Sequence, residues 1–140
     1  MIKVTELMIN DFVKLNDSNY QVQAIKKKGV IKLYENTKYG EHEIELNTDW
    51  IEEFVEPIPL TPEILEKNFG KPYPRGGFHN YRMQKDETIA FVIEDRRVSA
   101  APDNRVVLSR CPGTYICDVN YVHELQHALK LCKIKKEIIL

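Results

Sequence analysis

The sequence of 140 residues has few cysteines, no surplus of either charge and no long apolar run. Three cysteines, an odd number in a chain that starts without an apolar leader, argue against a disulfide framework. Twenty basic and 21 acidic residues leave a net charge of −1, which disfavours a strongly basic surface for nucleic acid. No stretch approaches the ~18 apolar residues of a membrane span. We therefore expect a folded cytoplasmic protein with no membrane partner.

The first 56 residues predict short strands separated by turns. Period-two alternation runs through Tyr20–Ile25 and His42–Leu46, and Phe12–Leu15 and Val30–Tyr34 are short apolar-rich segments. Strands at this spacing with tight turns are typical of a small SH3-like barrel or a meander. At the end of this lobe we expect Trp50, which precedes Ile51 and Phe54, to lie in the core.

Residues 57–140 predict a lobe that contains both helices and strands. Thr61 is a good N-cap, Pro62 suits the first helical position and Gly70 can adopt a left-handed C-cap, so a short helix is expected there. A helix from about Val119 to Cys132 closes the lobe. Between the helices we expect a second sheet of strands Phe78–Met83, Thr88–Glu94, Arg105–Ser109 and Thr114–Cys117.

The fold class expected is α+β and mainly antiparallel β, because the turns between strands are too short for helical crossovers. The two lobes, 1–56 and 57–140, are predicted to form one compact unit. Charge divides unevenly between them. Residues 1–60 hold 7 basic and 11 acidic groups, and residues 61–140 hold 13 basic and 10 acidic groups, so the second lobe is favoured for an anionic partner.

Residues 123–127 read His-Glu-x-x-His, the zincin pattern. On a helix this spacing puts His123 and His127 on one face around a metal, with Glu124 as general base on a zinc-bound water. A third ligand would have to come from upstream, from His79, Cys111 or Asp118. At ~100° per residue, a helical wheel places both histidines opposite the apolar stripe of Val122, Leu125, Leu129 and Cys132. We therefore expect both imidazoles to face solvent, which argues against a walled zinc site.

Three segments resemble a family of small, mostly uncharacterised proteins encoded by phages and prophages of gut anaerobes. Residues 5–13 resemble its ELRIGNxV start, residues 57–65 its PIPLTEExL middle and residues 119–129 its IKYVHQLQNLYFAL helix. The family has Gln at the position of Glu124 and Asn at that of His127, so its helix does not carry the zinc pattern. The resemblance implies a phage or prophage origin and brings no catalytic residues.

A set of arginines and glycines in the second lobe could bind an anion. Gly76 and Gly77 could let the backbone approach a phosphate, although a plain loop is favoured. Arg96 and Arg97 follow Glu94-Asp95, which also fits a turn with compensated charge. Tyr73, Phe78, Tyr81 and Tyr115 could stack on a base, or could be core and cross-strand residues. The complete set of candidate ligand-binding residues is Arg75, Gly76, Gly77, Arg82, Arg96, Arg97 and Arg105.

The leading hypothesis from the sequence is a phage-encoded binding protein that acts in the host cytoplasm without catalysis. Its partner would be an anionic small molecule or a host protein. In a specific version it antagonises host defence, as an oligomer that sequesters a nucleotide signal between protomers. The alternatives are a zinc hydrolase that uses His123, His127 and Glu124, and a nucleic-acid-binding adaptor.

Overall fold

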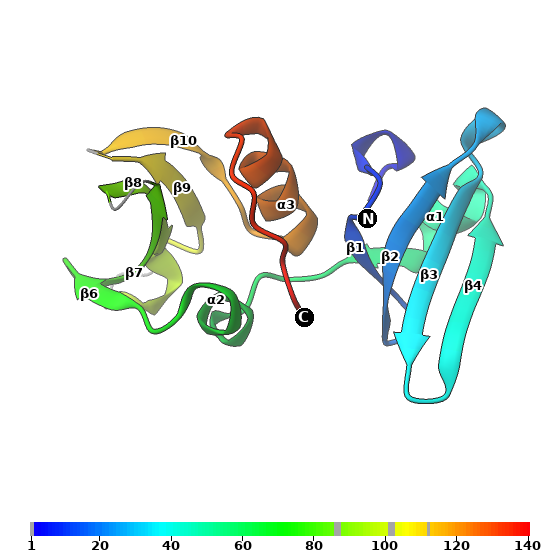
Figure 1. Cartoon of the computed structure of the whole chain (residues 1–140), viewed down its shortest axis with the longest axis horizontal. Helices are drawn as coiled ribbons and strands as arrows, with labels where there is room; N and C mark the ends of the chain where they lie inside the picture. The colour runs from blue at the N-terminus through cyan, green and yellow to red at the C-terminus, as the bar shows by residue number, and fades with distance from the viewer. Residues whose placement is uncertain (1, 86–87, 101–102, 112) are drawn as a thin grey trace. The chain divides into compact units, whose positions relative to one another are not determined.

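The computed structural model describes residues 2–85, 88–100, 103–111 and 113–140. Contacts along the chain separate it into two compact units, Met1–Ile58 (unit 1) and Pro59–Leu140 (unit 2), each with its own sheet (Figure 1). The expected class is confirmed, since both sheets are antiparallel and carry short helices. No described helix combines the length and the apolar character that a membrane span requires.

Unit 1 is built on a five-stranded sheet in the order β4-β3-β2-β1-β5. The first four strands form a meander, and β5 returns to pair with β1. Among the described residues no strand pair joins β4 to β5, so the sheet is an open meander rather than a closed barrel. The strands are β1 (Phe12–Leu15), β2 (Ser18–Ile25), β3 (Ile31–Thr37), β4 (Gly40–Leu46) and β5 (Val55–Pro57), with 3-10 turns η1 (Val4–Glu6) and η2 (Lys27–Gly29).

Alternation along these strands fills the core of unit 1. Val13, Leu15, Val22 and Leu33 point inward from β1, β2 and β3, while the residues between them are less buried. The turn from β1 to β2 is made by Asn16 and Asp17, which both have positive φ, as a two-residue hairpin of matching twist requires. A turn between these two short strands, as expected, is thus confirmed.

Helix α1 (Thr48–Phe54) joins β4 to β5 and was not predicted. The Asn47 side chain caps it by accepting a hydrogen bond from the Trp50 backbone N–H. Its buried residue is Ile51, whereas Trp50 and Phe54 are exposed. The expectation that Trp50 lies in the core was therefore wrong. A helix of seven residues turns only one narrow side to the sheet, and Ile51 occupies it.

Unit 2 contains a five-stranded meander in which every strand pairs with its neighbours in sequence, in the order β10-β9-β8-β7-β6. Strand β6 lies outside the predicted strands, while the other four match predicted strands within two residues. The bounds are β6 (Tyr73–Arg75), β7 (Phe78–Lys85), β8 (Thr88–Asp95), β9 (Val106–Arg110) and β10 (Thr114–Asp118), with a 3-10 turn η3 (Arg96–Val98).

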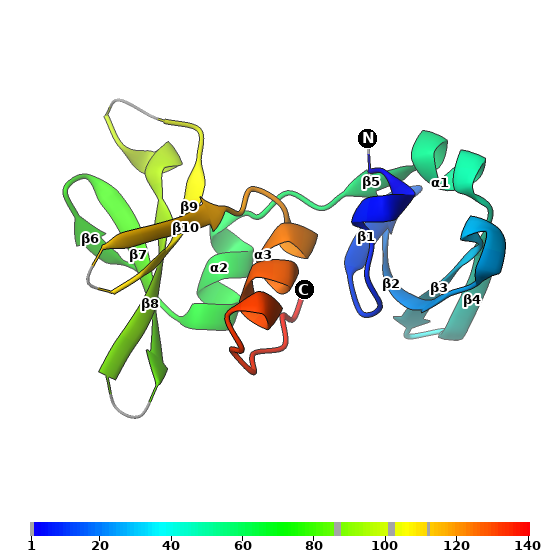
Figure 2. The same ribbon diagram turned by 90° about the horizontal axis from the view of Figure 1, so that it is seen from above.

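Two helices complete unit 2 (Figure 2). Helix α2 (Pro62–Phe69) starts at Thr61, whose hydroxyl accepts from the Ile64 N–H, and ends at Gly70 with a φ of 81°. The predicted helix and its N-cap are therefore confirmed. Gly70 ends the helix with a positive φ, but its ψ of −172° lies outside the left-handed helical region that was expected. Helix α3 (Val122–Leu131) is shorter than predicted, because the chain before it pairs with β9 and extends to Tyr121.

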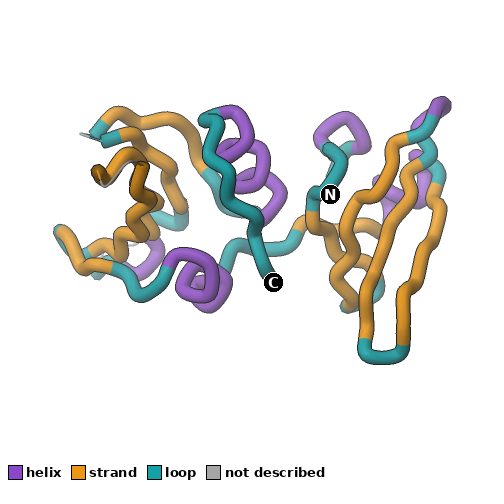
Figure 3. The backbone as a smooth tube through the Cα atoms, viewed as in Figure 1, coloured by secondary structure: helices purple, strands orange, loops and turns teal. Residues whose placement is uncertain are grey.

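The C-terminal segment after α3 is a loop that returns to α2 (Figure 3). The Asn68 amide holds it, with Nδ2 donating to the Ile139 carbonyl at 2.8 Å and Oδ1 accepting from the Ile139 N–H at 2.7 Å. Ile138 is buried beside this contact. A side-chain amide here supplies the donor and acceptor that a neighbouring strand would supply.

Candidate functional site

The register of β6 and β7 gathers four of the predicted ligand-binding and stacking residues on one face. Tyr73 lies opposite Asn80, and Arg75 lies opposite Phe78. Residues that face each other across an antiparallel pair share a side of the sheet, and so do residues two apart on one strand. Phe78, Asn80 and Arg82 are therefore on the same side as Tyr73 and Arg75. We call this side of the sheet the outer face.

Direct contacts agree with this register. The Arg82 guanidinium carbon lies 3.9 Å from the centre of the Tyr73 ring, a close cation–π contact. The Arg96 guanidinium carbon lies 5.7 Å from the centre of the Phe78 ring. Tyr73, Arg75 and Arg82 are exposed, so the β6–β7 end of the outer face presents cations and a ring to solvent.

The outer face continues across the sheet to β10. Arg82 lies opposite Val92, Val92 opposite Ser109, and Ser109 opposite Tyr115. Tyr115 is exposed like Tyr73, and the two lie on the strands at opposite edges of the sheet. Aromatic side chains therefore stand at both edges of one sheet face.

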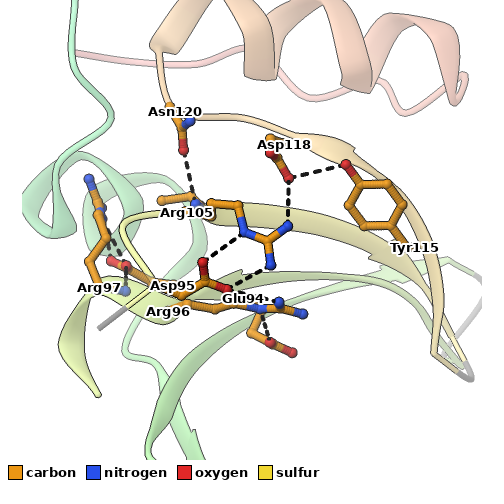
Figure 4. A network of polar contacts seen from close by, with 10 residues as sticks. Glu94, Asp95, Arg96, Arg97, Arg105, Tyr115, Asp118 and Asn120 are labelled. Carbon is orange, nitrogen blue, oxygen red and sulfur yellow. Dashed lines mark hydrogen bonds and ion pairs between the residues drawn. The ribbon is translucent and has the colours of Figure 1, made fainter. Parts of the chain in front are cut away.

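A network of ion pairs occupies the part of the outer face near η3 and β10 (Figure 4). Arg96 pairs with Glu94 at 2.7 Å and with Asp103 at 3.2 Å. Arg105 pairs with Asp103 at 2.7 Å and lies 4.0 Å from Asp118. Hydrogen bonds from Arg105 and then Arg96 hold the pKa of the Asp103 carboxyl below its usual value. Carboxylates of the same chain thus satisfy Arg96 and Arg105.

Arg97 belongs to the opposite side of the sheet, here called the inner face. Its Nε and Nη2 donate to the two carboxylate oxygens of Asp95 at 2.8 and 2.9 Å, and the Asp95 side chain is fully buried. The prediction that charge is compensated after Glu94-Asp95 is confirmed for both arginines. Successive strand residues point to opposite sides of a sheet, so Glu94 and Asp95 lie on different faces. Arg96 pairs with Glu94 on the outer face, and Arg97 pairs with Asp95 on the inner face.

Arg75 and Arg82 differ from the other predicted arginines. Neither makes an ion pair with any residue in the described part of unit 2. Gly76 and Gly77 connect β6 to β7 with φ angles of 59° and 83°, the signature of a type I′ hairpin turn. The glycines therefore fix the register that sets Arg75 opposite Phe78.

Helix α3 holds the residues of the zincin pattern. His123 is only 4% exposed, so the expectation that it faces solvent was wrong. The helical wheel used the large apolar side chains alone, whereas the buried side of α3 also includes Ala128 and His123 and spans a wider arc. The His123 and His127 rings are edge to face, with centres 5.7 Å apart.

The other parts of a zinc centre are not assembled on α3. One oxygen of Glu124 accepts hydrogen bonds from the backbone N–H groups of Asn120 and Tyr121, both at 3.1 Å. This carboxylate caps the helix. The residues that the structure describes contain no group of three His, Cys, Asp or Glu side chains placed to hold a metal ion. The three cysteines, Cys111, Cys117 and Cys132, are free thiols.

Comparison with protein-family models, with curated proteins and with solved structures gives no match to this chain. The residues that the sequence missed are the carboxylates of Asp103 and Asp118, which neutralise Arg105. Asp103 lies two residues before Arg105, just ahead of β9, and Asp118 lies on β10, the next strand. The alternation of side chains along β10 would have indicated the side on which Asp118 points. Function is therefore argued from the outer face itself.

Proposed function

We propose that this protein is a non-catalytic binding protein that holds a nucleotide on the outer face at β6 and β7. One observation carries the proposal: the hairpin places Arg75 and Arg82, which have no carboxylate partner among the described residues, beside the Tyr73 and Phe78 rings. A guanidinium binds phosphate oxygens in a bidentate manner, and an aromatic face stacks on a base. The same four side chains thus complement both parts of a nucleotide.

The nearby ion-pair network supports a small ligand rather than a long one. Arg96 and Arg105 are held by Glu94, Asp103 and Asp118, so the arginines with no partner among the described residues, Arg75 and Arg82, lie at one end of the outer face. With the resemblance to phage-encoded proteins, we propose that binding sequesters a nucleotide signal in the host cytoplasm. No observation in the structure favours zinc hydrolysis, because Glu124 caps α3.

The proposal predicts that a nucleotide binds and that Arg82 is needed. Isothermal titration calorimetry with ADP-ribose and a cyclic dinucleotide measures this directly. Arg82→Gln removes a charged donor and should weaken binding about tenfold or more. Tyr73→Ala should weaken it to a similar extent by removing the stacking ring.

Arg110→Gln is the matched control for the arginine variants. Arg110 is also exposed, but its partner Phe91 lies opposite Met83 on the inner face, so the substitution removes one charge from the other side of the sheet. Its binding should equal that of the unchanged protein. If neither nucleotide binds while a short single-stranded RNA does, the adaptor hypothesis replaces this one. Equal losses for Arg82→Gln and Arg110→Gln would show that only bulk charge matters.

A further inference from the structure

Helix α1 of unit 1 exposes a pair of neighbouring aromatic rings. Trp50 and Phe54 are one helical turn apart, with ring centres 4.8 Å apart and planes tilted by 33°. Trp50 is 53% exposed and Phe54 is 41% exposed, whereas Ile51 between them is fully buried. Exposed aromatic surface of this size is costly in water and commonly marks a place where another molecule binds.

The surroundings of the aromatic pair are strongly negative. Asp49, Glu52, Glu53 and Glu56, together with Val55, line a surface hollow of about 470 Å³ on the same helix and its C-terminal end. None of these four carboxylates makes an ion pair with a described residue, in contrast to Glu43 and Glu45, which pair with Lys32 and Lys26. The sequence from residue 39 to residue 66 contains no Lys or Arg. The negative charge at α1 is therefore uncompensated within this segment.

We propose that α1 is a docking surface for an arginine-rich peptide segment of a partner protein. A guanidinium can lie flat on the Trp50 or Phe54 ring while its N–H groups point to Glu53 or Asp49. Lysine would make the ion pairs but would stack less well, because its ammonium is a compact, strongly hydrated charge. The combination of exposed aromatic rings and carboxylates therefore selects arginine over lysine. This surface is separate from the nucleotide face proposed on unit 2.

Trp50 is the single tryptophan of the chain, so its fluorescence reports binding at α1 directly. The experiment titrates the full-length protein with hexaarginine and with hexalysine at low ionic strength. Hexaarginine should change the Trp50 emission saturably and bind about fivefold more tightly than hexalysine. Phe54→Ala keeps the reporter and should remove most of this preference for arginine.

Two double variants separate the surface from general charge attraction. Glu52→Gln with Glu53→Gln should weaken hexaarginine binding about tenfold at low salt, since two of the carboxylates that line the hollow on α1 are lost. Asp17→Asn with Glu41→Gln removes the same charge from exposed positions of unit 1 outside α1, and should change affinity less than about twofold. Circular dichroism confirms that each variant is folded.

The proposal is overturned by any of three results. The Trp50 emission could stay unchanged at saturating hexaarginine, hexalysine could bind as tightly as hexaarginine, or the Asp17/Glu41 variant could lose as much affinity as the Glu52/Glu53 variant. A complex that forms only between two copies of this chain, measured by light scattering without peptide, would also overturn it.

Discussion

At the residue scale, Tyr81 places a hydroxyl group inside unit 2. The residue is 1% exposed, and its hydroxyl makes no hydrogen bond with a described residue. Burial, followed by the negative charge of Asp95, raises the pKa of Tyr81 to about 12. The fold therefore favours the neutral phenol strongly over the phenolate.

This gives a pH dependence with a definite sign. The folded pKa lies above the unfolded value of 10, so the stabilising contribution of Tyr81 is complete below pH 10 and is lost as pH rises toward 12. Tyr81→Phe should remove that part of the alkaline loss and should change the free energy of unfolding at neutral pH by less than about 1 kcal/mol. Urea unfolding at several pH values measures both quantities.

Tyr73→Phe is the control for this prediction, because it removes a hydroxyl group from an exposed ring on the outer face. The free energy of unfolding of this variant should depend on alkaline pH as that of the unchanged protein does. Phenolate absorbance of the folded protein gives a second check. If the Tyr81→Phe protein loses stability above pH 10 as steeply as the unchanged protein, Tyr81 is not the group that titrates.

Single residues were predicted well where local chemistry decides their role, and poorly where tertiary contacts decide it. Thr61, Pro62 and Gly70 act within one helix, and the sequence identified all three. The exposure of Trp50 and the burial of His123 depend on what covers each helix. Hydrophobicity alone could not provide that information.

At the element scale, the side chain of Asn68 joins α2 to the C-terminal segment. Its Nδ2 also donates to the Ile64 carbonyl within α2 at 2.8 Å, so one amide makes three hydrogen bonds. Asn68 is buried, so water cannot easily replace its side chain as the hydrogen-bond partner of the Ile64 and Ile139 backbone groups.

Asn68→Ala is therefore expected to lower the free energy of unfolding by about 2–3 kcal/mol. Hydrogen exchange at the Ile139 amide should accelerate more than exchange in the strands of unit 2. Lys67→Gln is the matched control, since Lys67 also contacts this segment, at the Leu140 carbonyl, but is exposed. Its effect should stay below about 0.5 kcal/mol. Similar losses in the two variants would refute the role assigned to the Asn68 amide.

Elements with strong local signals were the ones that the sequence predicted. The hairpin strands of both sheets combine alternation with a turn signal, and α2 has a cap at each end. Helix α1 and strand β6 have seven and three residues, too few for either periodicity to show. The predicted binding residues come together on the outer face only because β6 pairs with β7. The sequence identified these residues, but without β6 it could not show that they lie side by side.

At the scale of the whole molecule, each unit has its own apolar core. Ile31, Leu33 and Ile51 are fully buried in unit 1, and Leu65, Ile93 and Leu108 are fully buried in unit 2. The division after Ile58 lies two residues beyond the predicted lobe boundary. Separate cores of this kind are what independently folding domains possess.

We therefore expect residues 59–140 to fold cooperatively when produced alone. Their urea transition, followed by circular dichroism, should be a single step with a midpoint close to that of unit 2 in the full chain. A shorter piece that ends at residue 133 lacks the segment held by Asn68 and should be less stable. An isolated 59–140 fragment without a cooperative transition would contradict the independence of this unit.

The strand orders of the two sheets have a consequence for the sequence of folding events. In unit 2 each strand pairs with the next one along the chain, so the sheet can grow by closing one short loop at a time. In unit 1 the β1–β5 pair joins Leu15 to Val55, across about forty residues. Completion of the first sheet must therefore wait for the segment that carries α1, and β5 is the strand that we expect to dock last.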